Sequence, residues 1–322
     1  MAGVKRSLAV DLGALHLSTP VVIASGCAGT GRELSGLVDL HKVGGLVSRT
    51  ITVLPRKGAS TPRVAETPSG IIWEVGFQNP GLDVFIADEL PRLARTGVPV
   101  IVSIGGGTLE EFVRLSSALA GCPEVAAIEA CLASSDDELA RPLLGAHVDR
   151  VTEIVGAVSR MSSAPVFAKL PLWGGVLVEL AGAAMRADAT GVTLGFPPPA
   201  LGVDIGGLKP SLGGVTGHLA GPALAPLALH AVFEVATAMP GIPIMASGGV
   251  RGGDDAVACV LAGATAVQVG TATLIDPTAA VEVATGVARY LKAKNLASPV
   301  DIRSRLRVPT AAPAGVREAP AP

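Results

Sequence analysis

The sequence predicts an α/β fold in which eight strand–helix units close into a (β/α)8, or TIM, barrel. Three observations support this: apolar strand-like runs alternate with amphipathic segments, eight such runs occur, and the last two end in glycine-rich turns. At 322 residues and 49% hydrophobic, the chain can bury the core of one large domain. We expect that domain to span residues 1–307.

The expected strands are short and rich in Val, Ile, Leu and Ala, as strands buried on both faces are. Eight of them favour a closed barrel over an open sheet. In chain order they are Val21–Ala24, Gly45–Arg49, Val98–Ser103, Val125–Glu129, Val166–Leu170, Gly191–Leu194, Ile244–Ser247 and Ala266–Val269.

Segments with apolar residues at helical spacing separate these strands and should form the outer ring. They include Leu109–Leu119, Asp149–Ser159, Ala223–Ala238, Asp254–Ala262 and Ala279–Lys294. Ahead of the first strand, Leu8–Leu17 carries Gly13-Ala14 between two apolar pieces, which predicts a hairpin across the barrel floor. The Ala- and Pro-rich end, Val308–Pro322, has no periodicity and is expected to be a disordered tail.

Composition argues against several classes of function. A formal net charge of −2 and scattered charges leave no basic surface for nucleic acid. The chain contains no apolar run of the ~18–20 residues that span a bilayer, nor an N-terminal signal-like core, so we expect a soluble cytoplasmic protein. Its four cysteines, at 27, 122, 131 and 259, show no metal-ligand spacing and are expected to be free thiols without a metal.

Two features point to a site at the carboxyl ends of the strands. The connections Thr50–Pro80 and Gly195–Gly221 are much longer than the others, and long loops at this face are commonly functional. The runs ending in Ser247-Gly248-Gly249 and Val269-Gly270-Thr271 bring backbone N–H groups together, which suits a phosphate. The alternative is that these glycines only form tight turns.

Several motifs together resemble the class 1 dihydroorotate dehydrogenases over nearly the whole chain. The resemblance is closest to the type that works with a second subunit carrying FAD and an iron–sulfur cluster. The motifs are Ala24-Ser25-Gly26-Cys27, the segment 61–70 (TPRVAETPSG), Gln78-Asn79-Pro80-Gly81-Leu82, Ser247-Gly248-Gly249-Val250 and Val269-Gly270-Thr271-Ala272.

The resemblance implies an FMN bound over the carboxyl ends of the strands. Lys169 matches the lysine beside the flavin N1 and O2 atoms, where a fixed ammonium would stabilise the reduced ring; the alternative is a solvated charge at the barrel rim. The other positions that match flavin contacts are Ala24, Ser25, Gly26, Arg49, Ser103 and Ser247 near the ring, and Gly221, Gly248, Gly249, Gly270 and Thr271 at the phosphate.

The residues that should act on the substrate depart from the family pattern. After the fourth strand, Cys131 replaces an asparagine and Ser134 stands at the position of the catalytic base. A serine needs a neighbour to accept its proton, whereas a thiol has an ordinary pKa of about 8.5 and loses its proton more readily. Ser134, Cys131 and Asp136 are therefore alternative bases, and a fourth reading is that none of them is catalytic.

Polar contacts to orotate have been replaced elsewhere too. Trp73, Phe196 and Ser103 occupy asparagine positions, and Arg49 replaces a lysine that touches flavin and substrate. Each buried polar group left unpaired costs roughly 1–3 kcal/mol, so orotate should bind poorly. Aromatic and histidine residues in the same loops predict an apolar pocket, unless they merely plug the barrel mouth. They are Trp73, Phe77, Trp173, Phe196 and His218, the last of which replaces a glycine.

The sequence thus predicts an FMN-dependent oxidoreductase that acts on a carbon–carbon bond of a small molecule more apolar than dihydroorotate, in the setting of specialised metabolism. Lys169 and Arg49 would support the flavin and the substrate. The alternatives are an authentic dihydroorotate dehydrogenase, a flavin-binding protein without redox turnover, and a phosphate-binding barrel without flavin. The class resemblance also raises a homodimer and a reductase partner as expectations.

Overall fold

The structure is a computed structural model that describes residues 6–132, 148–172 and 175–308. Eight parallel strands close into a barrel in the order β10-β15-β16-β3-β4-β7-β8-β9, which confirms the predicted fold. Each predicted strand overlaps an observed one, and the ends differ by two residues at most. The strands are β3 (Val21–Ile23), β4 (Gly45–Val47), β7 (Val100–Ile104), β8 (Val125–Cys131), β9 (Val166–Pro171), β10 (Gly191–Phe196), β15 (Ile244–Ser247) and β16 (Ala266–Val269).

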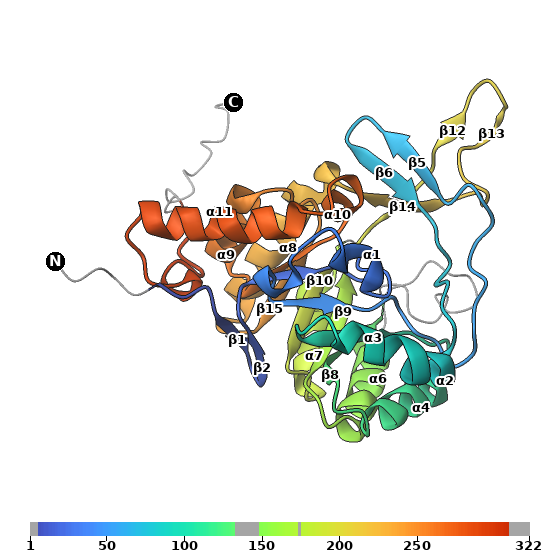
Figure 1. The fold of residues 1–322 in the computed structure, drawn as a ribbon, viewed down its shortest axis with the longest axis horizontal. Helices are drawn as coiled ribbons and strands as arrows, with labels where there is room; N and C mark the ends of the chain where they lie inside the picture. The colour runs from blue at the N-terminus through green and yellow to red at the C-terminus, as the bar shows by residue number, and fades with distance from the viewer. Residues whose placement is uncertain (1–5, 133–147, 173–174, 309–322) are drawn as a thin grey trace, which may run out of the picture.

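Amphipathic helices surround the barrel and bury their apolar faces against it (Figure 1). The capping box at Thr108 and Glu111 fixes the start of the first long helix, because each side chain bonds the other residue's backbone N–H. The five predicted helices are all present. The longer helices are α4 (Leu109–Leu119), α6 (Val148–Met161), α7 (Leu177–Arg186), α8 (Ala225–Ala238), α9 (Gly253–Ala262) and α11 (Ala279–Ala293).

Shorter helical pieces complete the ring. Between β4 and β7 the chain passes through a continuous helical stretch that includes one π-helical segment, from which Glu89 points toward the barrel mouth. The pieces are α1 (Arg32–Ser35), η1 (Leu40–Lys42), α2 (Leu82–Val84), η2 (Phe85–Glu89), α3 (Leu90–Ala94), η3 (Pro222–Leu224), α10 (Thr271–Ile275) and η4 (Pro299–Asp301).

The predicted floor hairpin is also confirmed. Strands β1 (Val10–Leu12) and β2 (Leu15–Leu17) pair in antiparallel register around a turn in which Gly13 has φ +61°. Their leucines pack into the apolar lower layer of the barrel interior, against Phe167 and Met245. The hairpin therefore seals one end of the barrel, and a ligand has access only at the other.

The two long connections fold against each other at that open end. Four short strands taken from both connections form an antiparallel sheet in the order β11-β14-β6-β5, and a second hairpin, β12–β13, projects beyond it (Figure 1). The sequence analysis expected loops here, because the strands are short and mostly half-exposed. They are β5 (Val64–Thr67), β6 (Gly70–Trp73), β11 (Pro199–Ala200), β14 (Gly217–Ala220), β12 (Val203–Asp204) and β13 (Lys209–Pro210).

Three further predictions concern membrane crossing, metals and the tail. Within the described residues, none of the helices combines the length and apolar character that crossing a membrane requires. Nor do those residues include a group of three or more His, Cys, Asp or Glu side chains placed to hold a metal ion. All four cysteines are free thiols. Most of the expected tail, residues 309–322, lies outside the described residues.

Candidate active site

A polar layer lies inside the barrel, above the apolar layer that packs on the floor hairpin. Alternation along each strand turns Glu129 of β8, Lys169 of β9, Thr193 of β10 and Gln268 of β16 toward the barrel axis. All four side chains are at least nine-tenths buried. Because buried charges are stable only when paired and hydrogen-bonded, this layer must hold a closed network.

Glu129 is the centre of that network. Its Oε1 atom lies 3.0 Å from Lys169 Nζ, and its Oε2 atom accepts hydrogen bonds from Thr193 Oγ1 at 2.9 Å and from Gln268 Nε2 at 2.7 Å. The carboxylate and the ammonium cancel in formal charge. Lys169 is therefore a buried, paired cation at the top of the barrel, which contradicts the alternative of a solvated rim charge.

Two thiols lie near this cation. Burial lowers the pKa of the Lys169 ammonium, but Glu129, followed by Cys131 and Cys27, outweighs burial and raises that pKa above its ordinary value. Burial raises the pKa of the Cys27 thiol to about 11, although Lys169 acts in the opposite direction. At neutral pH, Lys169 is charged and Cys27 is a neutral thiol.

The residues after β4 and β7 form the side of the mouth next to Lys169. Arg49 Nε lies 3.6 Å from Glu89 Oε2, so the guanidinium is held by a carboxylate of the helical stretch. Ser103 is completely buried, and its hydroxyl is 3.0 Å from that of Thr50. Ser25 Oγ donates to the Ser48 carbonyl at 2.8 Å. Ser48 connects these residues, because its hydroxyl donates to the Arg49 carbonyl at 2.8 Å and accepts from the Ser103 N–H at 3.0 Å, so the backbone of Arg49 joins Ser103 and Ser25 in one hydrogen-bonded rim.

The glycines predicted to bind a phosphate lie at the ends of neighbouring elements. Gly248 and Gly249 follow β15, Gly270 follows β16, and Gly221 follows β14. A Cβ atom added to Gly249 would lie 2.4 Å from the backbone nitrogen of Ala225, and Gly249 has φ +74°, so the chain there requires glycine. Gly221 also lies close to Thr271 at the start of α10, because a Cβ atom added to Gly221 would lie 3.7 Å from Thr271 Cγ2. That these residues bind a phosphate stays a prediction.

An aromatic cluster forms another part of the mouth, and we define it as Trp73, His218, Phe196 and Phe77. Ring centroids are 5.3 Å apart for Trp73 and His218, and 5.0 Å apart for Phe196 and His218. His218 Nδ1 lies 3.5 Å from Glu74 Oε2. Phe196 also packs with Cys131 and Phe77. The structure therefore brings together the four predicted pocket residues that it describes.

Of the three proton-transfer candidates, Cys131 belongs to the described residues. It ends β8, is paired in register with Lys169 and is 4% exposed, so it lies between the polar layer and the aromatic cluster. Ser134, Asp136 and the predicted pocket residue Trp173 fall outside the described residues.

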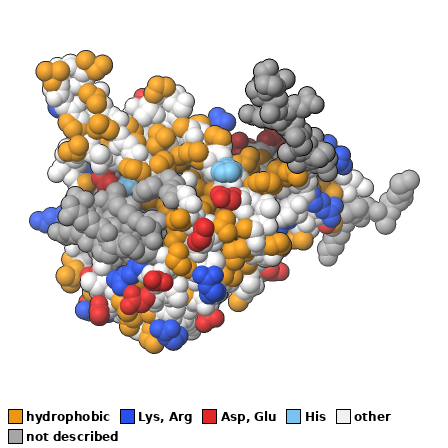
Figure 2. Space-filling view, turned by 180° about the vertical axis from the view of Figure 1, so that it is seen from behind, with side chains coloured by type: hydrophobic (Ala, Val, Ile, Leu, Met, Phe, Trp, Pro, Cys, Tyr) orange, Lys and Arg blue, Asp and Glu red, His pale blue; other side chains and the backbone are white. Residues whose placement is uncertain are grey.

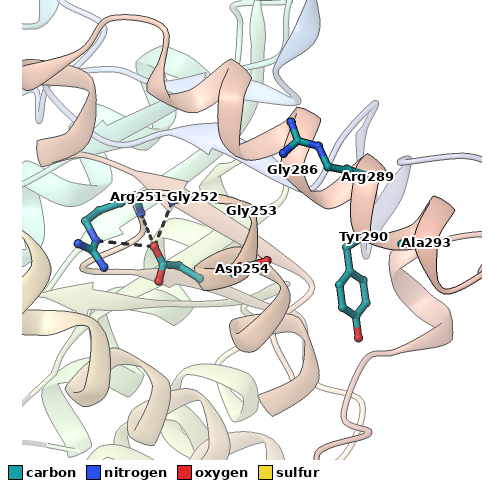
Figure 3. A pocket seen from close by; sticks show the side chains of 9 residues that line it. Arg251, Gly252, Gly253, Asp254, Gly286, Arg289, Tyr290 and Ala293 are labelled. Carbon is teal, nitrogen blue, oxygen red and sulfur yellow. Dashed lines mark hydrogen bonds and ion pairs between the residues drawn. The ribbon is translucent and has the colours of Figure 1, made fainter.

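A separate surface hollow of about 620 Å³ lies outside the barrel, between the start of α9 and α11 (Figure 3). Its lining includes Arg251, Arg289 and Tyr290. The start of α9 resembles an anion site, but Asp255 Oδ2 already accepts from the backbone N–H groups of Arg251 and Gly252, at 2.9 and 3.1 Å. The hollow therefore offers no free helix N-terminus and is not the candidate active site.

Comparison with known proteins matches residues 7–291 to the family model described as Dihydroorotate dehydrogenase. The chain belongs to the dihydroorotate dehydrogenase family. Two relatives carry the name "Dihydroorotate dehydrogenase B (NAD(+)), catalytic subunit". The relative from Geotalea daltonii is 36% identical over 304 residues, 94% of this chain and 99% of its own length. The relative from Desulforudis audaxviator is 40% identical over 287 residues, 89% and 93% of the two chains.

A solved structure supports the fold. The crystal structure of dihydroorotate dehydrogenase from Eimeria tenella in complex with ferulenol matches with a TM-score of 0.77 and 21% identity, covering 92% of this chain and 88% of the other. The family match and the relatives' names, rather than this structure, confirm the class 1 resemblance predicted from the motifs. As a member of this family, the chain is an FMN-dependent oxidoreductase that acts on a carbon–carbon bond.

The finer predictions concern the substrate and the metabolic setting. The relatives' names favour dihydroorotate, the alternative in the sequence analysis, over the more apolar substrate that was its first reading. They give no support to a setting in specialised metabolism. The alternative of a barrel without flavin is wrong, because members of the dihydroorotate dehydrogenase family bind FMN.

The described residues fit FMN in two respects. A Cβ atom added to Gly26 would meet no protein atom within 4 Å, so the mouth is open beside Ala24, Ser25 and Gly26. Among the described residues, Lys169 Nζ has one hydrogen-bond partner, which leaves two of its three donors for a ligand.

Sequence reasoning missed Glu129, Thr193 and Gln268. A single acidic residue inside the apolar run Val125–Cys131, at an inward-facing position, was the available signal for Glu129.

Proposed function

We propose that this chain is the catalytic subunit of a dihydroorotate dehydrogenase and oxidises dihydroorotate. The observation that carries the proposal is the full-length match to relatives of that name, at 36–40% identity over about nine-tenths of the chain. The flavin ring would lie against Ala24, Ser25 and Gly26, with Lys169, Arg49, Ser103 and Ser247 around it. Its phosphate would be held by Gly221, Gly248, Gly249, Gly270 and Thr271.

FMN, when bound, supplies a hydride acceptor for the carbon–carbon bond that is oxidised. The protein contributes charge, orientation and a proton acceptor. Lys169 holds a positive charge where the reduced ring becomes negative, and burial strengthens that interaction. Cys131, Ser134 or Asp136 would take the proton from the substrate carbon; of the three, Cys131 belongs to the described residues, where it is paired in register with Lys169. Phe196 and Phe77 exclude water beside it.

A second candidate function is the same reaction on a more apolar, flat substrate. The observation that favours it is the aromatic cluster, since Trp73 and Phe196 offer ring faces where orotate would need donors and acceptors. A planar, largely apolar molecule would stack against Trp73 and His218 without leaving polar groups unpaired.

One anaerobic experiment tests both candidates. The FMN-loaded protein is mixed with L-dihydroorotate, and flavin absorbance is followed. Bleaching within one turnover supports the first candidate. The rate of bleaching should fall at least about tenfold in Cys131→Ala or Lys169→Met and should not change in Cys122→Ala. Cys122 is a suitable control because it lies beyond the end of α4, outside the barrel mouth.

Absence of bleaching by dihydroorotate would remove the first candidate. In that case, bleaching of the oxidised flavin by the reduced forms of apolar cyclic enones, or recolouring of reduced flavin by the enones themselves, would support the second. Phe196→Asn provides an independent check: if the aromatic cluster excludes orotate, the variant should bind orotate at least about tenfold more tightly, measured as a shift of the flavin spectrum. A flavin that nothing reduces would indicate the alternative of a flavin-binding protein without turnover.

We propose in addition that the chain forms a homodimer and works with a reductase subunit. Support for the reductase comes from the words "catalytic subunit" in the relatives' names. Support for the homodimer comes from the β12–β13 hairpin, whose apolar side chains project from the molecule (Figure 2). Four apolar residues in or near this hairpin are more than half exposed: Val203 (59%), Ile205 (82%), Leu208 (88%) and Val215 (69%). A solvent-exposed set of this kind commonly marks an interface.

A further inference from the structure

Glu129 is a fully buried carboxylate that the proposed reaction does not use. It is 0% exposed, and its two oxygens take donors from three different strands: Lys169 of β9, Thr193 of β10 and Gln268 of β16. A carboxylate is retained in such a place only if its charge is compensated, because an unpaired buried charge costs several kcal/mol. The compensating charge here is Lys169.

The hydrogen-bond directions identify Glu129 as the ionised acceptor of the network. Lys169 can only donate, and Gln268 presents its amide N–H to Oε2. Among the described residues, the carbonyl oxygen of that same amide has no partner, so Gln268 leaves its own acceptor unused in order to donate to the carboxylate. Thr193 and Gln268 share Oε2, which leaves Oε1 entirely to the ammonium.

Two consequences follow for a flavin above Lys169. The ion pair fixes the position of a long, flexible side chain, because Lys169 Nζ is held 3.0 Å from Oε1. The same carboxylate offsets part of the positive field that the ammonium would exert on the ring, since its opposite charge lies only 3.0 Å from Nζ. Lys169 favours the reduced ring, and Glu129 limits that effect.

We infer that Glu129 is a positioning residue that holds Lys169 beside the flavin and sets the flavin reduction potential by partly neutralising its charge. The inference rests on the ring placement given in the proposed function, but it does not depend on which substrate is oxidised.

The test is a potentiometric titration of FMN bound to Glu129→Gln. The amide keeps the size of the side chain and removes its charge, so the reduced flavin should become at least tenfold more favourable at pH 7, about 30 mV for a two-electron couple. The increase should shrink as pH rises, because the buried Lys169 then loses its proton without a carboxylate to retain it. A merely structural role would not produce this pH dependence.

Three variants make the result interpretable. Thr193→Val removes a hydrogen bond to the same carboxylate without changing charge, so reduction should stay within about threefold of the wild type. Lys169→Met should make reduction at least tenfold less favourable. If Glu129→Gln does not fold or bind FMN, Glu129→Asp provides the measurement: it keeps the charge but withdraws it from Lys169, and reduction should become at least about threefold more favourable.

The outcomes separate the inference from the proposed function. Unchanged potentials in the Glu129 variants, with the expected loss in Lys169→Met, would refute the inference and leave the ring placement standing. Unchanged potential in Lys169→Met as well would mean that the ring does not lie beside Lys169, and the proposed placement would then be wrong.

Discussion

Two glycines of the proposed FMN site have similar backbone conformations but very different surroundings. Gly26 has φ +79° and Gly249 has φ +74°, both in the left-handed region that disfavours other residues. A Cβ atom added to Gly26 meets nothing within 4 Å, whereas one added to Gly249 lies 2.4 Å from the nitrogen and 2.6 Å from the Cα of Ala225. Substituting each by alanine therefore separates backbone strain from steric overlap.

Gly249→Ala should lose more unfolding free energy than Gly26→Ala, because its new Cβ atom overlaps Ala225. The left-handed conformation costs roughly 1–2 kcal/mol in each variant, and alanine recovers about 0.4–1 kcal/mol through the unfolded state. Gly249→Ala must also displace the start of α8, which adds about 1–3 kcal/mol. We expect Gly26→Ala to lose about 1 kcal/mol of unfolding free energy and Gly249→Ala about 3 kcal/mol.

Urea unfolding of the two FMN-free variants and the wild type measures this difference. FMN affinity is then determined by fluorescence quenching, and both variants should bind at least about tenfold more weakly, because the new methyl group enters the ring space at Gly26 and disturbs the phosphate corner at Gly249. Equal stabilities of Gly26→Ala and Gly249→Ala would refute the steric argument. Unchanged FMN affinity in Gly26→Ala would refute the ring placement.

Three further predictions concern other parts of the chain. Because the pKa of Cys27 is raised to about 11, its alkylation by iodoacetamide should accelerate about tenfold per pH unit between pH 8 and 10, as followed by mass spectrometry; a plateau below pH 9 would contradict this. Asn79→Ala should lower the unfolding free energy by about 2–4 kcal/mol in urea, since its buried side chain makes four hydrogen bonds within the connection between β4 and α2; a loss below 1 kcal/mol would mean that the connection is held elsewhere. The double variant Ile205→Asp/Leu208→Asp should shift the protein from dimer to monomer in light scattering with FMN still bound, and a dimer that persists would place the interface on another surface.

The barrel was predictable because its signals are local. Runs such as Val166–Leu170 and Ile244–Ser247 are apolar along their whole length, and the helices between them carry clear periodicity. Lys169 stood out for the same reason, as a charge inside a strand that had to be buried. The glycine pair Gly248-Gly249 was recognisable from its place after the seventh strand.

What the sequence did not reveal depends on contacts between distant residues. Glu129 meets its donors at separations of 40, 64 and 139 residues, and only closure of the barrel brings those strands together. The contact of His218 with Trp73 depends on pairing between two long connections whose strands are four residues each. Short strands with mixed exposure give little periodic signal.

That pairing has a consequence for how the family can change its chemistry. Since β6 hydrogen-bonds to β14, the segments entering from the second and sixth barrel strands form one piece of backbone that carries the aromatic rings. Of the proposed phosphate glycines, Gly221 adjoins this piece at the end of β14, whereas Gly248, Gly249 and Gly270 follow the seventh and eighth strands. Substitutions at Trp73 or His218 can therefore change the shape of the substrate pocket while the FMN-binding glycines after β15 and β16 stay the same. Members of the family could thus change their substrate through few substitutions and still bind FMN.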